Sequence, residues 1–170
     1  ASEVLQELIR LQGEDRQGKA KSLHMLTHIY DATGQKLQAD TTRAQTLALI
    51  EELWGTATLG YAEVVANMAE SLMAQERLAD AAELYAKAIP AFAGCVPADD
   101  ARLAGCRLGQ LICLRDSGQL EKAAEVGKDS PDRTRRWLNE YGLVLFLQER
   151  FDEAVEVFQQ SLDLPETITQ

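Results

Sequence analysis

Residues that build disulfide frameworks, metal centres and sheets are scarce in this 170-residue chain. Its three cysteines form no Cys-x-x-Cys pair, so neither a zinc framework nor a disulfide scaffold is indicated. Aromatic residues make up 6% of the chain, and no useful stretch alternates between apolar and polar residues, which argues against strands. We therefore expect an all-α protein with reduced thiols, located in the cytoplasm, that holds no metal or cofactor.

Positive charge is also scarce, because 27 acidic residues outweigh 17 basic ones and leave a net charge of −10. A chain this acidic repels a phosphate backbone, so we expect no nucleic-acid partner. The densest basic cluster, Arg133, Arg135 and Arg136, is interpreted as the solvated start of a helix. No apolar run is long enough to span a bilayer and no signal stretch occurs, so we expect no membrane partner.

A six-residue phrase that begins with Gly or Glu and ends in alanine occurs four times in the chain. Its copies are 34–39, 76–81, 118–123 and 149–154. The closing alanines Ala39, Ala81 and Ala123 are 42 residues apart, and the fourth copy ends 31 residues later. A fixed period of about 20 to 50 residues is typical of stacked helical hairpins.

Apolar residues recur at helical spacing in nine segments, each of which is predicted to be a helix. The segments are 2–11, 19–33, 38–54, 58–74, 78–92, 101–116, 120–128, 134–148 and 151–162, and either Asp132 or Thr134 can cap the eighth. They form one domain over 1–170, with repeats at about 18–54, 58–92, 101–129 and 133–164 and a capping or preceding-repeat helix at 1–12. Because the chain begins with alanine and an apolar stripe, we expect it to be a fragment of a longer protein.

Small residues recur where the two helices of a hairpin must approach closely. Ala39, Ala81, Ala123 and Ala154 begin the second helices, and Thr27, Ala69 and Gly142 lie twelve residues earlier on the first helices. A bulkier side chain at these positions would push the helices apart and leave voids. Cys106 and Cys113 lie seven residues apart on one helical face, so we expect them to pack as small apolar residues.

With these positions in register, the chain resembles the tetratricopeptide repeat family over residues 16–164. The second copy carries the family pattern in Met68, Ala69, Leu72, Ala81, Tyr85 and Ala88. The first copy departs from it with Arg43 and Thr46, and the third has Leu111 where a small residue is usual and a shortened second helix. The 42-residue period resembles the longer-helix variant of the family. This resemblance implies antiparallel hairpins stacked into a right-handed α-α superhelix.

The resemblance also implies that the first helix of each hairpin lines a concave groove that binds a peptide or helix of another protein. By register, the groove residues are Lys21, His24, His28, Asn67, Glu70, Arg115, Arg136, Asn139 and Leu143, with Asp31 as a further exposed inner position. Asn67 falls where some members clamp a C-terminal carboxylate. Gly105 and Gly109 replace the cations of that clamp, which favours an extended segment or a partner helix instead.

The two histidines of the chain, His24 and His28, lie four residues apart on one helical face, a spacing that can hold a metal ion. The stretch lacks the glutamate of a zinc-protease helix and has no nearby cysteine. We interpret both as groove-lining or surface side chains, whose titration near neutral pH would make binding sensitive to pH. The chain has no P-loop and no GxSxG, GxGxxG or HExxH motif, so we expect no enzyme activity.

These features predict a protein-interaction scaffold or a regulatory domain that binds another protein or peptide in the groove. One alternative is a self-association module, driven by exposed Phe146 or Trp137 or by an uncovered terminal repeat. A second alternative is the sensor domain of a larger transcription regulator or signalling protein, whose output segment would lie outside these residues.

Overall fold

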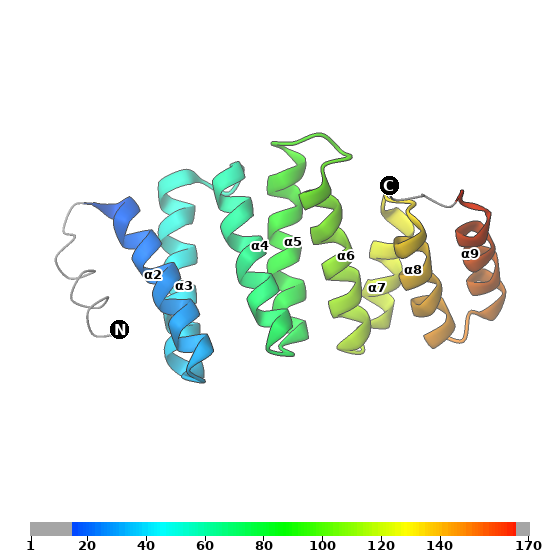
Figure 1. Cartoon of the computed structure of the whole chain (residues 1–170), viewed down its shortest axis with the longest axis horizontal. Coiled ribbons are helices and arrows are strands. Elements are labelled where there is room, and N and C mark those ends of the chain that lie inside the picture. The colour runs from blue at the N-terminus through cyan, green and yellow to red at the C-terminus, as the bar shows by residue number, and fades with distance from the viewer. Residues whose placement is uncertain (1–14, 166–170) are drawn as a thin grey trace.

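The computed structural model describes residues 15–165, which form eight helices and no strand. They are α2 (Arg16–Ala32), α3 (Lys36–Trp54), α4 (Leu59–Ala74), α5 (Leu78–Ala93), α6 (Ala101–Asp116), α7 (Leu120–Asp129), α8 (Arg135–Leu147) and α9 (Phe151–Asp163). Figure 1 shows them as one continuous row in which consecutive helices run in opposite directions. The predicted all-α stack of hairpins is confirmed, and the helix predicted at 2–11 lies outside the described residues.

Polar side chains begin the first helix of each hairpin by accepting a hydrogen bond from a free backbone N–H. Asp15 accepts from Gly18 and thereby starts α2 at Arg16, three residues earlier than predicted. Thr134, one of the two predicted caps, accepts from the backbone of Trp137 at the start of α8. Asp132 instead accepts a hydrogen bond from the Arg107 guanidinium of α6 at 3.3 Å.

The same left-handed turn joins the two helices of every hairpin. Gly34, Glu76, Gly118 and Glu149 open the four phrases, with φ values of 72°, 60°, 78° and 62°. In each turn the next backbone N–H donates to a carbonyl near the end of the first helix, as in Arg77 to Leu72 at 2.9 Å. A left-handed backbone costs about 1–2 kcal/mol for a residue with a side chain, and at the two glutamates the backbone hydrogen bonds of the turn offset this cost.

Small residues lie at the contact between paired helices, as the sequence predicts. Ala39, Ala81 and Ala123 are fully buried. On the first helices Ala69 is fully buried, and a side chain added at Gly142 would meet the ring of Phe158 at 2.9 Å. These positions therefore set the distance between helices within a hairpin.

The third hairpin is irregular because α7 has only ten residues. Its Gly127 lies directly beneath the ring of Tyr141 of α8, so any side chain at this position would overlap that ring. The indole nitrogen of Trp137 donates to the Gly127 carbonyl at 3.4 Å. Leu111, which replaces the usual small residue on α6, is fully buried. Trp137 and Tyr141 of α8 thus pack directly against the short α7.

Two of the three cysteines are buried and all three are free thiols. Cys106 and Cys113 of α6 lie in the hydrophobic core of the protein, as predicted, whereas Cys95 is exposed in the loop after α5. Across residues 15–165, no helix combines the length and the apolar character that crossing a bilayer requires.

Candidate interaction surface

The first helices α2, α4, α6 and α8 carry all nine residues predicted to line a groove. Exposed side chains among them are Lys21, His28, Asn67, Glu70, Arg136, Asn139 and Leu143, whereas His24 and Arg115 are partly buried. On α2, α4 and α8 the exposed members are spaced three, four or seven residues apart, so they share a face, whereas α6 contributes no exposed member. Their role in binding stays a prediction.

The two histidines of α2 contact each other. Their Nε2 atoms lie 3.2 Å apart and their rings meet edge to face. Burial, together with the nearby charge of His28, lowers the pKa of His24 below its ordinary value. The Nδ1 atom of His24 is buried without a hydrogen-bond partner. In the described part of the chain, no group of three or more His, Cys, Asp or Glu side chains gathers to hold a metal ion.

Arg115 of α6 is engaged with neighbouring carboxylates. Its guanidinium pairs with Glu140 of α8 and with the adjacent Asp116. The hydrogen bond to Asp116 is the main cause that raises the pKa of Arg115. This residue therefore joins the third hairpin to the fourth, in addition to any contact it makes with a ligand.

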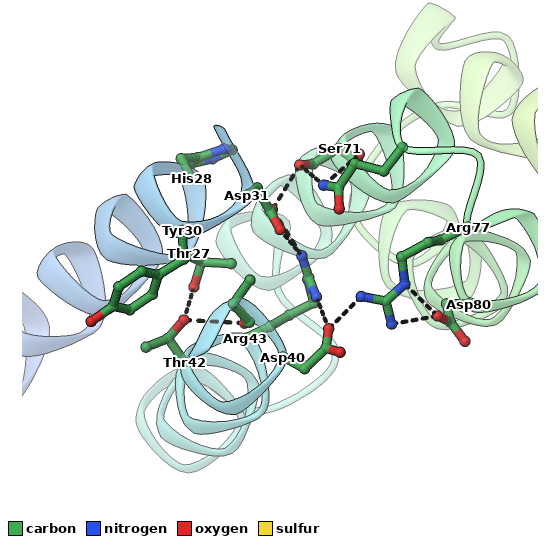
Figure 2. Close-up of polar contacts among 12 residues, drawn as sticks. Thr27, His28, Tyr30, Asp31, Asp40, Thr42, Arg43, Ser71, Arg77 and Asp80 are labelled. Atoms are coloured by element: carbon green, nitrogen blue, oxygen red, sulfur yellow. Dashed lines mark hydrogen bonds and ion pairs between the residues drawn. The ribbon is translucent and has the colours of Figure 1, made fainter. Parts of the chain in front are cut away.

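A buried ion pair joins the two helices of the first hairpin, and Figure 2 shows the cluster around it. The Arg43 guanidinium of α3 donates to both carboxylate oxygens of Asp31 of α2, at 2.8 and 3.0 Å. The two side chains are 7% and 8% exposed. Ser71 of α4 donates to Asp31 at 3.0 Å, so the carboxylate connects three helices. The expectation that Asp31 is exposed was wrong, because its carboxylate lies between Arg43 of α3 and Ser71 of α4.

Asp40 extends this cluster to α5. It accepts from Arg43 at 2.6 Å and from Arg77 at 2.5 Å, and Arg77 also pairs with Asp80. Sequence reasoning missed the cluster, although the register contained a signal for it. Counting 42 residues on from Asp31 and Arg43 leads to Met73 and Tyr85, whose side chains contact each other at 3.9 Å. A charged pair thus replaces a thioether–phenol pair at equivalent positions.

Exposed apolar side chains gather on the last hairpin. Leu143, Phe146, Leu147, Phe151, Val155 and Leu162 are between 37% and 73% exposed. The rings of Phe146 and Phe151 meet edge to face with centroids 5.7 Å apart. Trp137, the other aromatic residue predicted to drive self-association, is only 1% exposed, so that prediction was wrong.

An open pocket of about 450 Å³ lies between α2 and α3 at the other end of the stack. The described residues that line it are Leu23, Leu26, Tyr30, Leu37, Gln38, Thr41, Thr42 and Gln45. No carboxylate, histidine or cysteine is among them, so these residues offer no acid–base pair for catalysis.

The similarity to known proteins lies in the fold. No family model and no curated protein matches the chain. A kinesin light chain protein of Podosopora anserina with nearly identical TPR-like repeats matches with a TM-score of 0.71 at 16% identity, over 95% of this chain and 83% of the other. Its Q17M variant gives 0.69 at 17% identity, over the same shares of both chains.

BtubC (BKLC) from P. vanneervenii matches with a TM-score of 0.66 at 15% identity, over 94% of this chain and 70% of the other. The chain therefore has a TPR-like fold of all-α helical repeats, as the resemblance in its sequence implied.

Proposed function

We propose that this chain is a protein-interaction domain that holds a segment of a partner protein, extended or helical, on the face shared by its first helices. Stacked helical hairpins build long continuous surfaces, and proteins of this architecture use them for binding. The observation that carries the proposal is a set of exposed polar residues on three of the four first helices, α2, α4 and α8, that the fold does not use. Lys21, Asn67 and Arg136 make no hydrogen bond or ion pair with another described residue.

The exposed side chains of this face change from polar to apolar along the stack, and this change indicates which ligand would fit. The α2 end presents Lys21 and His28, and the α8 end presents the apolar side chains of Leu143 and Leu147. A segment that fits this face would place polar or acidic side chains toward α2 and apolar side chains toward α8.

Peptides selected from a random display library against the folded protein test this proposal. We expect the triple variant Asn67→Ala/Arg136→Ala/Leu143→Ser to weaken binding of independently selected peptides at least about tenfold, measured by titration calorimetry. The matched control is Gln160→Ala/Lys128→Ala/Leu37→Ser, which changes exposed residues of second helices. Peptides that lose affinity for the control variant and keep it for the groove variant would overturn the proposal.

The proposed role is non-catalytic and cytoplasmic, with protein and not nucleic acid as the partner. The net charge of −10 supports the last point, because it repels nucleic acid over long range. The role is compatible with a free-standing scaffold and with a sensor domain of a larger regulator. Binding of the selected peptides in the presence of excess duplex DNA should be unchanged.

A further inference from the structure

We infer that the outer face of α9 is a second docking site, separate from the proposed groove, which takes a positively charged amphipathic helix of a partner protein. The α9 stripe, defined here as Phe151, Val155 and Leu162, follows the spacing i, i+4 and i+11 and therefore runs along one side of the helix. These side chains are 53%, 55% and 73% exposed. Three large apolar side chains aligned on one helix face form an exposed apolar patch of the kind that marks a protein interaction site.

The repeat shows what covers this face elsewhere in the molecule. Ala154 of α9 corresponds to Ala81 of α5, so the α9 stripe corresponds to Leu78, Ala82 and Ile89. In α5 these residues belong to or pack against the core, and Ala82 is only 3% exposed. The helix packed beside α5 is α6, the first helix of the next hairpin. A helix is therefore the element that fits the equivalent face of α9.

Charge along the edge of the stripe defines the chemistry of that helix. Asp152, Glu156 and Asp163 are exposed beside the stripe and form no ion pair with a described residue. The equivalent positions of α5 include Ala79 and Glu83, and these residues line a pocket together with residues of α6 and α7, among them Gln110 and Lys122. Residues along this edge therefore face the next hairpin, and at α9 they would present three carboxylates to an incoming helix.

Positive charge on the incoming helix satisfies these carboxylates. Pairing of α9 with the α9 of a second copy would bring two acidic edges together, and like charges at a close interface oppose association. The combination of an apolar stripe and an acidic edge thus selects a basic partner helix over a second copy.

The probe is a 16-residue helical peptide with an apolar stripe at i, i+3, i+4 and i+7 and lysine and arginine beside it. One matched peptide has glutamate in place of the basic residues, and another has the same composition in scrambled order. We expect the probe to bind the full chain in fluorescence anisotropy at least about tenfold more tightly than either matched peptide. Raising the salt concentration from 50 to about 300 mM should weaken this binding.

Variants of the chain locate the site. Val155→Ser/Leu162→Ser should weaken probe binding at least about tenfold, and Asp152→Asn/Glu156→Gln/Asp163→Asn should reduce its salt dependence. The control Leu37→Ser and the groove variant Asn67→Ala/Arg136→Ala/Leu143→Ser should leave it unchanged, so this inference can fail while the proposed function stands. Equal binding of the scrambled peptide, no effect of Val155→Ser/Leu162→Ser, or a concentration-dependent dimer that this variant abolishes would overturn the inference.

Discussion

The buried pair of Asp31 and Arg43 allows a direct test of whether equivalent residue pairs of the first and second hairpins can replace each other. The second hairpin places Met73 and Tyr85 at the equivalent positions, and both arrangements fill the same contact. We predict that Asp31→Met/Arg43→Tyr, which copies the second hairpin into the first, folds with a stability within about 1 kcal/mol of the wild type or above it. Replacing a buried ion pair with apolar groups of similar volume is often neutral or stabilising by about 1–4 kcal/mol.

The single substitutions should behave very differently. Arg43→Tyr leaves the Asp31 carboxylate, 8% exposed, with only the Ser71 hydroxyl as a partner, and we expect a loss of about 3–5 kcal/mol. Asp31→Met leaves Arg43 its contact with Asp40, so the expected loss is smaller, about 1–3 kcal/mol. The Nε atom of Arg43 is buried and lacks a hydrogen-bond partner even in the wild type, which reduces what the double variant gives up.

Urea unfolding at pH 7, followed by circular dichroism, measures these differences, and hydrogen exchange locates them. Because each hairpin contacts only its neighbours, faster exchange in the single variants should be confined mainly to α2 through α5, while α8 and α9 stay protected. The coupling free energy between the two substitutions should reach at least about 3 kcal/mol. Additive effects, or single losses below about 1 kcal/mol, would refute the reasoning.

Three further predictions address packing, thiols and pH. Gly127→Ala should lower the free energy of unfolding in urea by about 1–3 kcal/mol, because the added methyl group overlaps the ring of Tyr141. Gly105→Ala, where a Cβ meets nothing within 4 Å, should be neutral or stabilising by up to about 1 kcal/mol. Similar values for both variants would contradict the packing assigned to α7. Burial raises the pKa of the two buried cysteines to about 11, so a thiol reagent at pH 8 should titrate only Cys95 in the folded protein and three thiols in denaturant; two fast thiols in the folded protein would count against this. Because the pKa of His24 is lowered on folding, protonation favours the unfolded chain, and the free energy of unfolding should fall as the pH drops below about 6.5. His24→Gln should flatten this pH dependence, and an unchanged slope in this variant would show that other groups cause it.

Local signals in the sequence were sufficient to predict the hairpins. The left-handed turn at Gly34 has a specific backbone requirement that glycine meets, and the alanine five residues later marks where the second helix meets the first. The same phrase then located the turns at Glu76 and Glu149, where the residue type alone would have argued against a left-handed backbone. Repetition therefore carried information that a single copy lacks.

Specific contacts between helices were harder to predict, because they depend on pairs of residues that the repeated phrase does not mark. Asp31 has the composition of a solvated helix position, and only the partner Arg43, twelve residues later on another helix, explains its burial. The shortened α7 was predicted from Ser130 and Pro131, which follow its last residue, but the packing of the Tyr141 ring over Gly127 involves a residue of the next hairpin. The pattern that would have revealed the ion pair is an aspartate on a first helix together with an arginine at the usual aromatic position of the second helix.

In the later repeats, the positions equivalent to Asp31 on the first helices are Met73, Arg115 and Phe146. Met73 and Arg115, like Asp31, contact side chains of neighbouring helices and are therefore not available to a ligand. These residues hold neighbouring helices together, so they cannot also change freely to suit a partner. Phe146 differs, because it is 52% exposed and its ring meets that of Phe151, a residue of the α9 stripe. The two proposed surfaces, the exposed polar face of the first helices and the α9 stripe, therefore consist of residues that can change without disturbing these contacts between helices.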